Sequence, residues 1–360
     1  MKIKKIKFWS ENLKLTRPYK ISYETIDSVE NIFVHIELEN GIWGIGSGSP
    51  AEFVTGENIL SSKNALKNHS EELLLNKNIN SIDIICESIS DVLSSTPAAC
   101  AALDIALFDA HSKFYNVSLC DFFGRCHDSL YTSVTIGIKS IEESLKEAEE
   151  YVGKGFHILK IKTGSNVDHD IELMHKIREV ISDSISIRVD ANQGYTTNEL
   201  IKFVKNTKQK NIELIEQPLP REHNSKMKNL SESIRAICAA DESLHGPYDA
   251  TRLSVIPHNF GIYNIKLMKC GGLYQARKIA KVANDRGIDL MWGCMDESIV
   301  SISAAIHLAL ASPSTRYLDL DGSFDLAKDI VSGGFMLKEG KLFPTMQPGL
   351  GVNYIDEMNI

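Results

Sequence analysis

Lysines and acids recur at regular intervals between residues 157 and 321. They stand at the ends of short apolar runs, and successive runs are 25 to 28 residues apart. That spacing is about what one strand, one helix and two short loops require. A strand that is buried on both faces gains nothing from charge, so charges that end successive strands point to a chemical site. The residues at these strand ends are, in chain order, Lys160, Lys162, Asp190, Asn192, Glu216, Asp241, Lys266, Cys294, Asp296, Asp319 and Asp321.

Three of these residues are carboxylates on consecutive predicted strands, Asp190, Glu216 and Asp241. Three unpaired acids at one position repel each other and therefore require a cation. An all-oxygen set suits a hard divalent ion such as Mg²⁺, which keeps coordination positions for a substrate. The alternative is an ion-pair network in which each acid contacts a lysine. We favour one Mg²⁺ per subunit, because the lysines and the acids lie on separate groups of strands.

The lysines fall on two sides of the expected ring of strands. Lys160 and Lys162 share one face of the second strand, and Lys266 ends the sixth, which is opposite the second in a ring of eight. A base on each side of a carbon is what moving a proton between its two faces requires. Lys160 and a divalent ion would both disfavour the charged form of Lys162. Mg²⁺ would also neutralise the enediolate left after proton removal.

Eight βα units would position these residues. Each apolar, β-branched run is followed by a helical pattern, and residues 132–138 form the first of eight predicted strands. Such units form a (β/α)₈ barrel with its active site at the carboxyl ends of the strands. A barrel takes about 250 residues. The chain has 360 residues, so we expect a second, smaller domain.

The segment before the barrel predicts an α+β capping domain. Residues 1–50 alternate as an antiparallel meander with a break at Thr16-Arg17-Pro18, and residues 57–118 contain three helical patterns. The loops 16–26 and 46–58 can cover the barrel mouth as lids. We expect a capping domain at 1–125, the barrel at 126–322, and a tail at 323–360 that returns to the capping domain.

The composition excludes several classes of protein. No apolar run approaches the roughly 20 residues of a membrane span. The net charge is −8 with scattered lysines, which argues against a nucleic-acid patch. Seven cysteines without a CxxC pair suit reduced thiols in the cytoplasm. We therefore expect a cytoplasmic protein with a small-molecule substrate and with neither nucleic acid nor membrane as a partner; the sequence leaves a homo-oligomer open.

The series KIK, DANQG, EQP, ADES, IKLMKCGG and GCMDES resembles the enolase superfamily, in its muconate-lactonising-enzyme-like subgroup. The resemblance extends over nearly the whole chain. Residues 319–321 (DLD), together with GCMDES, are similar to dipeptide epimerases, in which the Asp-x-Asp pair holds the substrate's α-ammonium. The implied acid/bases are Lys162 and Lys266, with Lys160 as the partner of Lys162. The implied Mg²⁺ ligands are Asp190, Glu216 and Asp241, and the implied substrate contacts are Thr135, Lys160, Cys294, Asp296, Asp319 and Asp321.

The first lid loop departs from the pattern of the family. In members specific for Ala-Glu, an arginine of this loop meets the glutamate side chain, and alignment from the shared T-x-P start places Glu24 there. Glu24 and Asp296 would add two carboxylates to the side-chain pockets. This departure predicts a specificity that is broad or accepts cationic residues.

The resemblance implies an isomerase that epimerises dipeptides at the C-terminal residue, L-Xaa-L-Yaa to L-Xaa-D-Yaa, by two-lysine proton transfer through an enediolate. A cycloisomerase or an o-succinylbenzoate synthase-like enzyme would use the same chemistry and stays open as an alternative. A barrel that only binds is disfavoured, because no catalytic position is missing.

Overall fold

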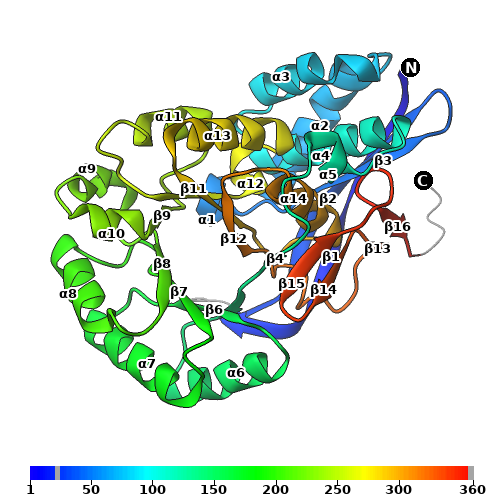
Figure 1. Ribbon diagram of the computed structural model, residues 1–360. Helices are drawn as coiled ribbons and strands as arrows, with labels where there is room; N and C mark the ends of the chain where they lie inside the picture. Colours follow the sequence, from blue (N-terminus) through cyan, green and yellow to red (C-terminus); the bar gives the residue numbers. More distant parts are fainter. Residues whose placement is uncertain (21–24, 356–360) are drawn as a thin grey trace.

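The structure is a computed structural model that describes residues 1–20 and 25–355. Eight parallel strands pair in chain order from β5 to β12 (Figure 1). The ring closes where Thr132, just ahead of β5, pairs with Leu318 of β12. The barrel strands are β5 (Val134–Ile136), β6 (Ile158–Lys162), β7 (Ser186–Asp190), β8 (Ile212–Glu216), β9 (Cys238–Ala240), β10 (Ile262–Ile265), β11 (Asp289–Gly293) and β12 (Thr315–Asp319).

Helices connect these strands and cover the outside of the barrel, as Figure 1 shows for α6, α7 and α8. The predicted alternation of strands and helices, and the barrel fold, are thereby confirmed. The connecting helices are α6 (Ile141–Gly153), α7 (Val167–Val180), α8 (Thr197–Thr207), η2 (Arg221–His223), α9 (Asn224–Met227), α10 (Glu232–Ala236), α11 (Pro247–Leu253), α12 (Leu267–Cys270), α13 (Leu273–Arg286) and α14 (Ile299–Leu310).

The first part of the chain forms an α+β capping domain. The predicted meander is the antiparallel sheet β1-β2-β3, and the three predicted helices are present. At the predicted break, Thr16-Arg17-Pro18, β1 continues as a strand, but its pairing with β2 is interrupted between Lys14 and Tyr19. Thr16 N–H donates instead to Asp325 O at 2.7 Å. The elements are β1 (Ile3–Lys20), β2 (Thr25–Leu38), β3 (Trp43–Gly48), α1 (Glu52–Thr55), α2 (Ile59–Leu74), η1 (Ile79–Ser81), α3 (Ile82–Val92), α4 (Pro97–Phe114) and α5 (Leu119–Phe123).

The tail lies against the capping domain, and in Figure 1 its red strands stand beside the blue N-terminal ones. Leu326 pairs with Leu15, and the Tyr354 hydroxyl lies 2.9 Å from His35 Nδ1. These contacts support the return of the tail, and we keep the boundaries 1–125, 126–322 and 323–360 as a proposal. The remaining strands are β4 (Leu130–Tyr131), β13 (Val331–Gly333), β14 (Phe335–Lys338), β15 (Lys341–Pro344) and β16 (Val352–Tyr354).

Glycines at every second position of β3 allow α4 to touch the sheet. A Cβ atom at Gly46 would lie 1.9 Å from Ala102 O, and Gly44 and Gly48 meet carbonyl oxygens of α4 at 2.2 Å in the same way. Alternate strand residues share one face, and residues four apart share one face of a helix. A glycine stripe therefore lies on an alanine stripe, and the two backbones are in direct contact.

The same helix holds the barrel through Asp104. The Asp104 carboxylate accepts hydrogen bonds from Leu273 N at 2.5 Å and Tyr274 N at 3.2 Å, at the start of α13. Burial raises the pKa of Asp104 to about 7, although these two N–H groups favour its charged form. Helix α4 thus contacts β3 on one side and a barrel helix on the other, which fixes the capping domain relative to the barrel.

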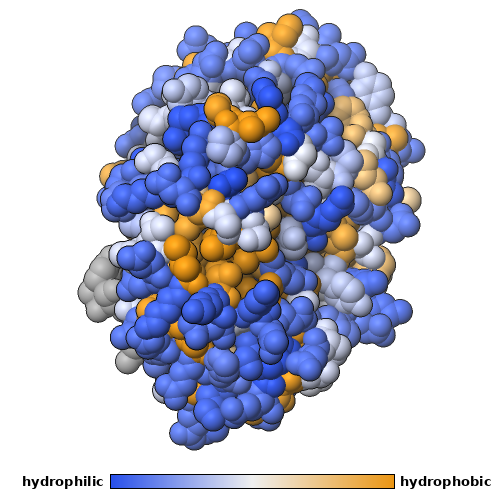
Figure 2. Space-filling view, turned by 60° about the vertical axis from the view of Figure 1, so that its left-hand side comes forward, coloured by the Kyte–Doolittle hydropathy of each residue, from blue (hydrophilic) through white to orange (hydrophobic). Residues whose placement is uncertain are grey.

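The surface is mostly hydrophilic, with an apolar area near the centre of the face in Figure 2. In the part of the chain that the structure describes, no helix is both long and apolar enough to cross a membrane. All seven cysteines, which lie within the described residues, are free.

Gly46→Ala should destabilise the protein by about 2 kcal/mol or more, because the added methyl group overlaps the backbone of α4. The control is Gly153→Ala, at an exposed helical glycine where a Cβ meets nothing within 4 Å. It should be neutral or stabilising by up to about 1 kcal/mol. Urea unfolding followed by circular dichroism measures both changes. Equal stabilities of the two variants would show that β3 and α4 can separate without cost.

Candidate active site at the strand ends

The three acids lie side by side and out of contact with water. Asp190 and Glu216 are the last residues of β7 and β8 and are paired in register, and Asp241 directly follows β9. Their exposed fractions are 0%, 0% and 4%. The structure therefore brings together the carboxylates that the sequence placed on successive strand ends.

The lysines lie among these acids rather than apart from them. Lys160 Nζ is 3.1 Å from Asp190 Oδ2 and 2.7 Å from Glu216 Oε2. Lys162 Nζ is 2.8 Å from Asp190 Oδ2, and Lys266 Nζ is 2.8 Å from Asp241 Oδ2. The lysines and the acids do lie on different strands, but the inference that they therefore do not form ion pairs is wrong, because side chains of adjacent and next-but-one strands meet in the lumen. Within residues 1–20 and 25–355, no three His, Cys, Asp or Glu side chains are arranged to hold a metal.

Each acid is nevertheless held in the same way. One oxygen of each carboxylate accepts from a donor of the surrounding scaffold, and the other oxygen contacts a lysine of the lumen. The scaffold donors are Asn192 N for Asp190 Oδ1 at 3.0 Å, Asn264 Nδ2 for Glu216 Oε1 at 2.8 Å, and Lys269 Nζ for Asp241 Oδ1. The inner oxygens are thus free to contact a cation in the lumen.

The chemistry of these residues suits a hard divalent cation, although their side chains are paired with lysines in the described structure. The donor set is entirely oxygen, as such ions prefer. Glu216 Oε2 is buried and makes no hydrogen bond, since its 2.7 Å contact with Lys160 lacks hydrogen-bond geometry. Asn264 Oδ1, which is also buried, has no partner either. A buried oxygen without a hydrogen bond costs free energy, so these two oxygens have capacity for a further cation.

The charges shift the pKa values of the acids in opposite directions. Burial raises the pKa of Glu216 to about 8, and Asp190 adds to this effect. Burial opposes ionisation of Asp190 and Asp241 as well, but their lysines hold the pKa of each below its usual value. The site therefore stabilises two carboxylates fully and the third only in part.

The two aspartates after β12 have different surroundings. Asp319 Oδ2 is 2.7 Å from Lys160 Nζ, and its Oδ1 accepts from Ser133 Oγ at 2.6 Å. Asp321 Oδ2 accepts from Thr135 N at 2.8 Å. Burial and the charge of Asp319 raise the pKa of Asp321 to about 7. Of the pair, only Asp319 belongs to the lysine network in the described structure.

The other predicted substrate contacts lie at the same end of the barrel. Cys294 Sγ lies 3.3 Å from Asp319 O, where it donates a hydrogen bond. The Asp296 carbonyl accepts from Ser49 Oγ at 2.9 Å, which ties the second predicted lid loop to the strand ends. Glu24 lies outside the described residues.

The sequence reasoning missed Lys269 and Gln217. Lys269 has a side-chain exposure of 1%, and its ammonium contacts Asp241 Oδ1 and, at 2.5 Å, Asp241 O. Gln217 is fully buried, and its Oε1 accepts from Asp241 N at 3.0 Å. The signal for Lys269 was a charge inside the apolar run IKLMKC, and that for Gln217 was an amide next to Glu216.

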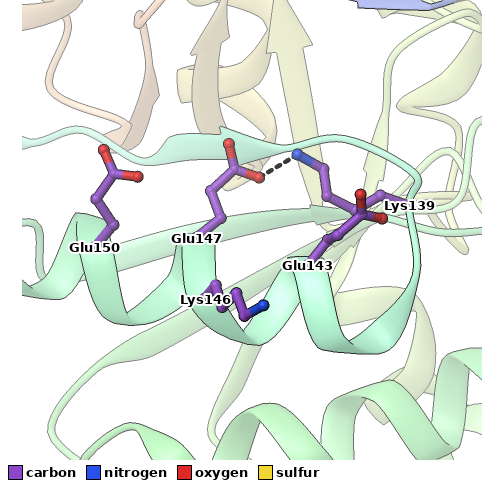
Figure 3. A pocket seen from close by; sticks show the side chains of 5 residues that line it. All are labelled: Lys139, Glu143, Lys146, Glu147 and Glu150. Atoms are coloured by element: carbon purple, nitrogen blue, oxygen red, sulfur yellow. Dashed lines mark hydrogen bonds and ion pairs between the residues drawn. The ribbon is translucent and has the colours of Figure 1, made fainter.

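A surface pocket of about 340 Å³ lies along α6, apart from these residues (Figure 3). Its walls are Lys139, Glu143, Lys146, Glu147 and Glu150. The acids already have partners: Glu147 pairs with Lys139, Glu150 with Arg17 and Lys154, and Glu143 caps its own helix at Ser140. The pocket is therefore a paired, solvated helix surface, and the barrel mouth is the candidate site.

Comparison with known proteins places the chain in a family. Residues 3–124 match the mandelate racemase / muconate lactonizing enzyme N-terminal domain, and residues 143–358 match the enolase C-terminal domain-like family. The L-Lys-D/L-Arg epimerase of Desulforapulum autotrophicum is 55% identical over 355 residues, covering 99% of this chain and 100% of the relative. The L-Ala-D/L-Glu epimerase of Clostridium acetobutylicum is 33% identical over 358 residues, again covering 99% and 100%.

The fold of this chain is also similar to that of a solved epimerase structure. The dipeptide epimerase of Methylococcus capsulatus, complexed with Mg and the dipeptide L-Arg-D-Lys, matches with a TM-score of 0.96 and 46% identity, covering 98% of this chain and 100% of that chain. The family models, the relatives and the solved structure all match nearly the whole length of the chain. The chain therefore belongs to the enolase superfamily, as an isomerase of the mandelate racemase and muconate lactonizing enzyme family that also contains these epimerases.

Proposed function

We propose that this protein is a cytoplasmic, Mg²⁺-dependent dipeptide epimerase that inverts the α-carbon of the C-terminal residue, L-Xaa-L-Yaa to L-Xaa-D-Yaa. The observation that carries the proposal is the placement of the two lysines. Lys162 ends β6 and Lys266 follows β10, and three strands separate β6 from β10 on either side of the ring. Both ammonium groups contact the same acid cluster. The epimerases among the relatives support the reaction.

In the proposed reaction, one lysine removes the α-proton and the other delivers a proton to the opposite face. Lys162 and Lys266 have side-chain exposures of 29% and 10%, so both stand where the lumen opens. Lys160 has a side-chain exposure of 4% and contacts three carboxylates, which suits a fixed positive charge better than a base. The direction of epimerisation then depends on which lysine is neutral when the substrate binds.

Asp190, Glu216 and Asp241 are the residues that would hold Mg²⁺. Their outer oxygens are held by the scaffold, and their inner oxygens contact only lysine ammonium groups in the described structure. Bound there, the ion would supply positive charge to the substrate carboxylate while the α-proton leaves. The lysines that now contact these oxygens would then be available to the substrate.

Asp321 is the residue that favours a dipeptide over the alternative substrates. Among the described residues, no lysine or arginine forms an ion pair with Asp321, although it is partly buried and lies close to Asp319. An α-ammonium would supply the missing positive charge. The substrates of cycloisomerases and of o-succinylbenzoate synthase-like enzymes have no ammonium, so those reactions leave Asp321 without a partner.

We also propose that the preferred dipeptides carry cationic side chains. The relative from Desulforapulum autotrophicum is named for Lys and Arg, and the structure from Methylococcus capsulatus holds L-Arg-D-Lys. The sequence adds Glu24 and Asp296 to the two loops expected to meet the side chains. In a partly shielded site, a like charge within a few ångströms costs on the order of a few kcal/mol, which disfavours glutamate substrates.

Lys162→Ala and Lys266→Ala should each lower the epimerisation rate on the order of 10²–10⁴-fold, because each removes the base of one face. Each variant should still exchange the α-proton of one epimer with D₂O, and the two variants should differ in which epimer that is. Mass spectrometry of dipeptides recovered from D₂O measures this. Lys281→Ala, at an exposed lysine paired with Asp285, is the control and should behave as wild type. Wild-type epimerisation by either active-site variant would refute the two-base mechanism.

Asp321→Asn should raise KM for dipeptides about tenfold or more with little change in Mg²⁺ affinity, because the α-ammonium loses a charged partner. Asp319→Asn should in addition lower kcat, since the oxygen that lies 2.7 Å from Lys160 Nζ loses its negative charge. Steady-state kinetics and calorimetric Mg²⁺ titration separate the two effects. Equal turnover of free and N-acetylated dipeptides by the wild type would contradict the role of the ammonium.

The wild type should prefer L-Lys-L-Arg and L-Ala-L-Lys to L-Ala-L-Glu by about a hundredfold in kcat/KM. Glu24→Arg and Asp296→Asn should each reduce the difference in kcat/KM between the cationic dipeptides and L-Ala-L-Glu, because each removes a carboxylate from the loops around the substrate. Comparing the three dipeptides with the three proteins tests this. A wild-type preference for L-Ala-L-Glu that neither substitution changes would mean that these charges do not set the specificity.

A further inference from the structure

Asp241 differs from the other two acids in how its backbone is held. Asp190 and Glu216 are strand residues, paired with each other in the sheet. Asp241 lies one residue beyond β9, a strand of three residues whose pairings with β8 and β10 end at Ala239 and Ala240. The sheet therefore does not fix the backbone of Asp241. Its carbonyl accepts from Lys269 Nζ at 2.5 Å and from Leu244 N at 3.0 Å, and its N–H requires an acceptor from outside the ladder.

The side chain of Gln217 takes this place. Its Oε1 accepts from Asp241 N at 3.0 Å and from Ser243 N at 3.1 Å, and its Nε2 donates to Leu219 O at 2.8 Å. The amide is fully buried and its polar atoms are bound, so its orientation is fixed. Gln217 thereby replaces the ladder hydrogen bonds that a longer β9 would have made.

The backbone of Gln217 is itself held in an unusual conformation. Its φ of 33° lies in the left-handed region, which non-glycine residues rarely adopt. Its N–H donates to Ala239 O at 2.9 Å, and its carbonyl accepts from Gln193 N at 2.7 Å. Hydrogen bonds to both neighbouring segments therefore maintain the strained position, from which the side chain reaches the residues after β9.

We propose that Gln217 is a positioning residue for the metal site: it holds Asp241 so that the inner carboxylate oxygen, Oδ2, meets those of Asp190 and Glu216. The inference rests on the Mg²⁺ dependence of the proposed function. None of the hydrogen bonds of Gln217 described above involves Lys162, Lys266 or an inner carboxylate oxygen. It acts through Asp241, whose outer oxygen Oδ1 is held independently by Lys269.

Gln217→Met tests the proposal, because it keeps side-chain length and neutrality but removes the acceptor. Groups that orient metal ligands typically contribute 10–100-fold to metal affinity. We expect calorimetric titration of the metal-free variant with Mg²⁺ to show binding about 10–100-fold weaker than wild type. The Mg²⁺ concentration for half-maximal activity should rise in parallel, with kcat at saturating Mg²⁺ within about threefold of wild type. Gln217→Asn, whose amide is one methylene shorter, should show the same change, and Gln209→Met at an exposed glutamine should show none.

The outcomes separate a positioning role from a structural one. A purely structural role lowers the melting temperatures of the metal-free and Mg²⁺-loaded protein equally, whereas a positioning role also shrinks the rise in melting temperature that Mg²⁺ produces. Mg²⁺ affinity within twofold of wild type in both variants overturns the inference and leaves the proposed function intact. Variants that stay unfolded at every Mg²⁺ concentration also overturn it in favour of a structural role. A wild-type protein that binds no Mg²⁺ overturns the proposed function and the inference together.

Discussion

Buried charge requires a partner of opposite sign, and this requirement governs the strand ends of the barrel. A single uncompensated charge in a protein interior costs several kcal/mol. Asp190, Glu216 and Asp241 are all buried, and each contacts at least one lysine. Arg188, one layer deeper on the same face of β7, donates to Ser133 Oγ, which in turn donates to Asp319. The chemistry of the site therefore depends on which cation, a lysine ammonium or a bound metal ion, lies next to each carboxylate.

The exchange of one cation for another explains how the same side chains can be stable in the absence of substrate and reactive in its presence. In the described structure the lysines compensate the acids, so the ion-pair network and the proposed metal site are two arrangements of the same oxygens. The scaffold donors Asn192 N, Asn264 and Lys269 hold the outer oxygens in either arrangement. A cation at the inner oxygens would change the partners of Lys162 and Lys266 without moving the strands. The barrel supplies the positions, and the charge balance decides which groups are free to react.

The capping domain contributes by placing the loop that contains Ser49 beside the same strand ends. Its position depends on α4, which contacts the glycines of β3 on one side and holds α13 through Asp104 on the other. The Ser49 hydroxyl then reaches the Asp296 carbonyl, so a loop of the first domain meets the seventh barrel strand near the site. The hydrogen bonds from α13 to Asp104 connect this domain to the barrel. The loop around Ser49 and the lysines at the strand ends are thus positioned by separate domains.

The sequence by itself determined the fold and most of the site, because strand periodicity and charges at strand ends are local properties of the chain. Seven apolar runs ending in charge, with residues 132–138 as the first of eight strands, sufficed to predict the barrel and to select Asp190, Glu216, Asp241, Lys162 and Lys266. Only the tertiary structure decided how these residues meet. Lys160 contacts acids of three other strands. Asp319 pairs with Lys160, whereas Asp321 accepts a hydrogen bond from Thr135 N. Asp241 is held by Gln217 and Lys269, which come from the ends of two other strands. Such contacts depend on the register of neighbouring strands and on side-chain direction in the lumen, which no local pattern specifies.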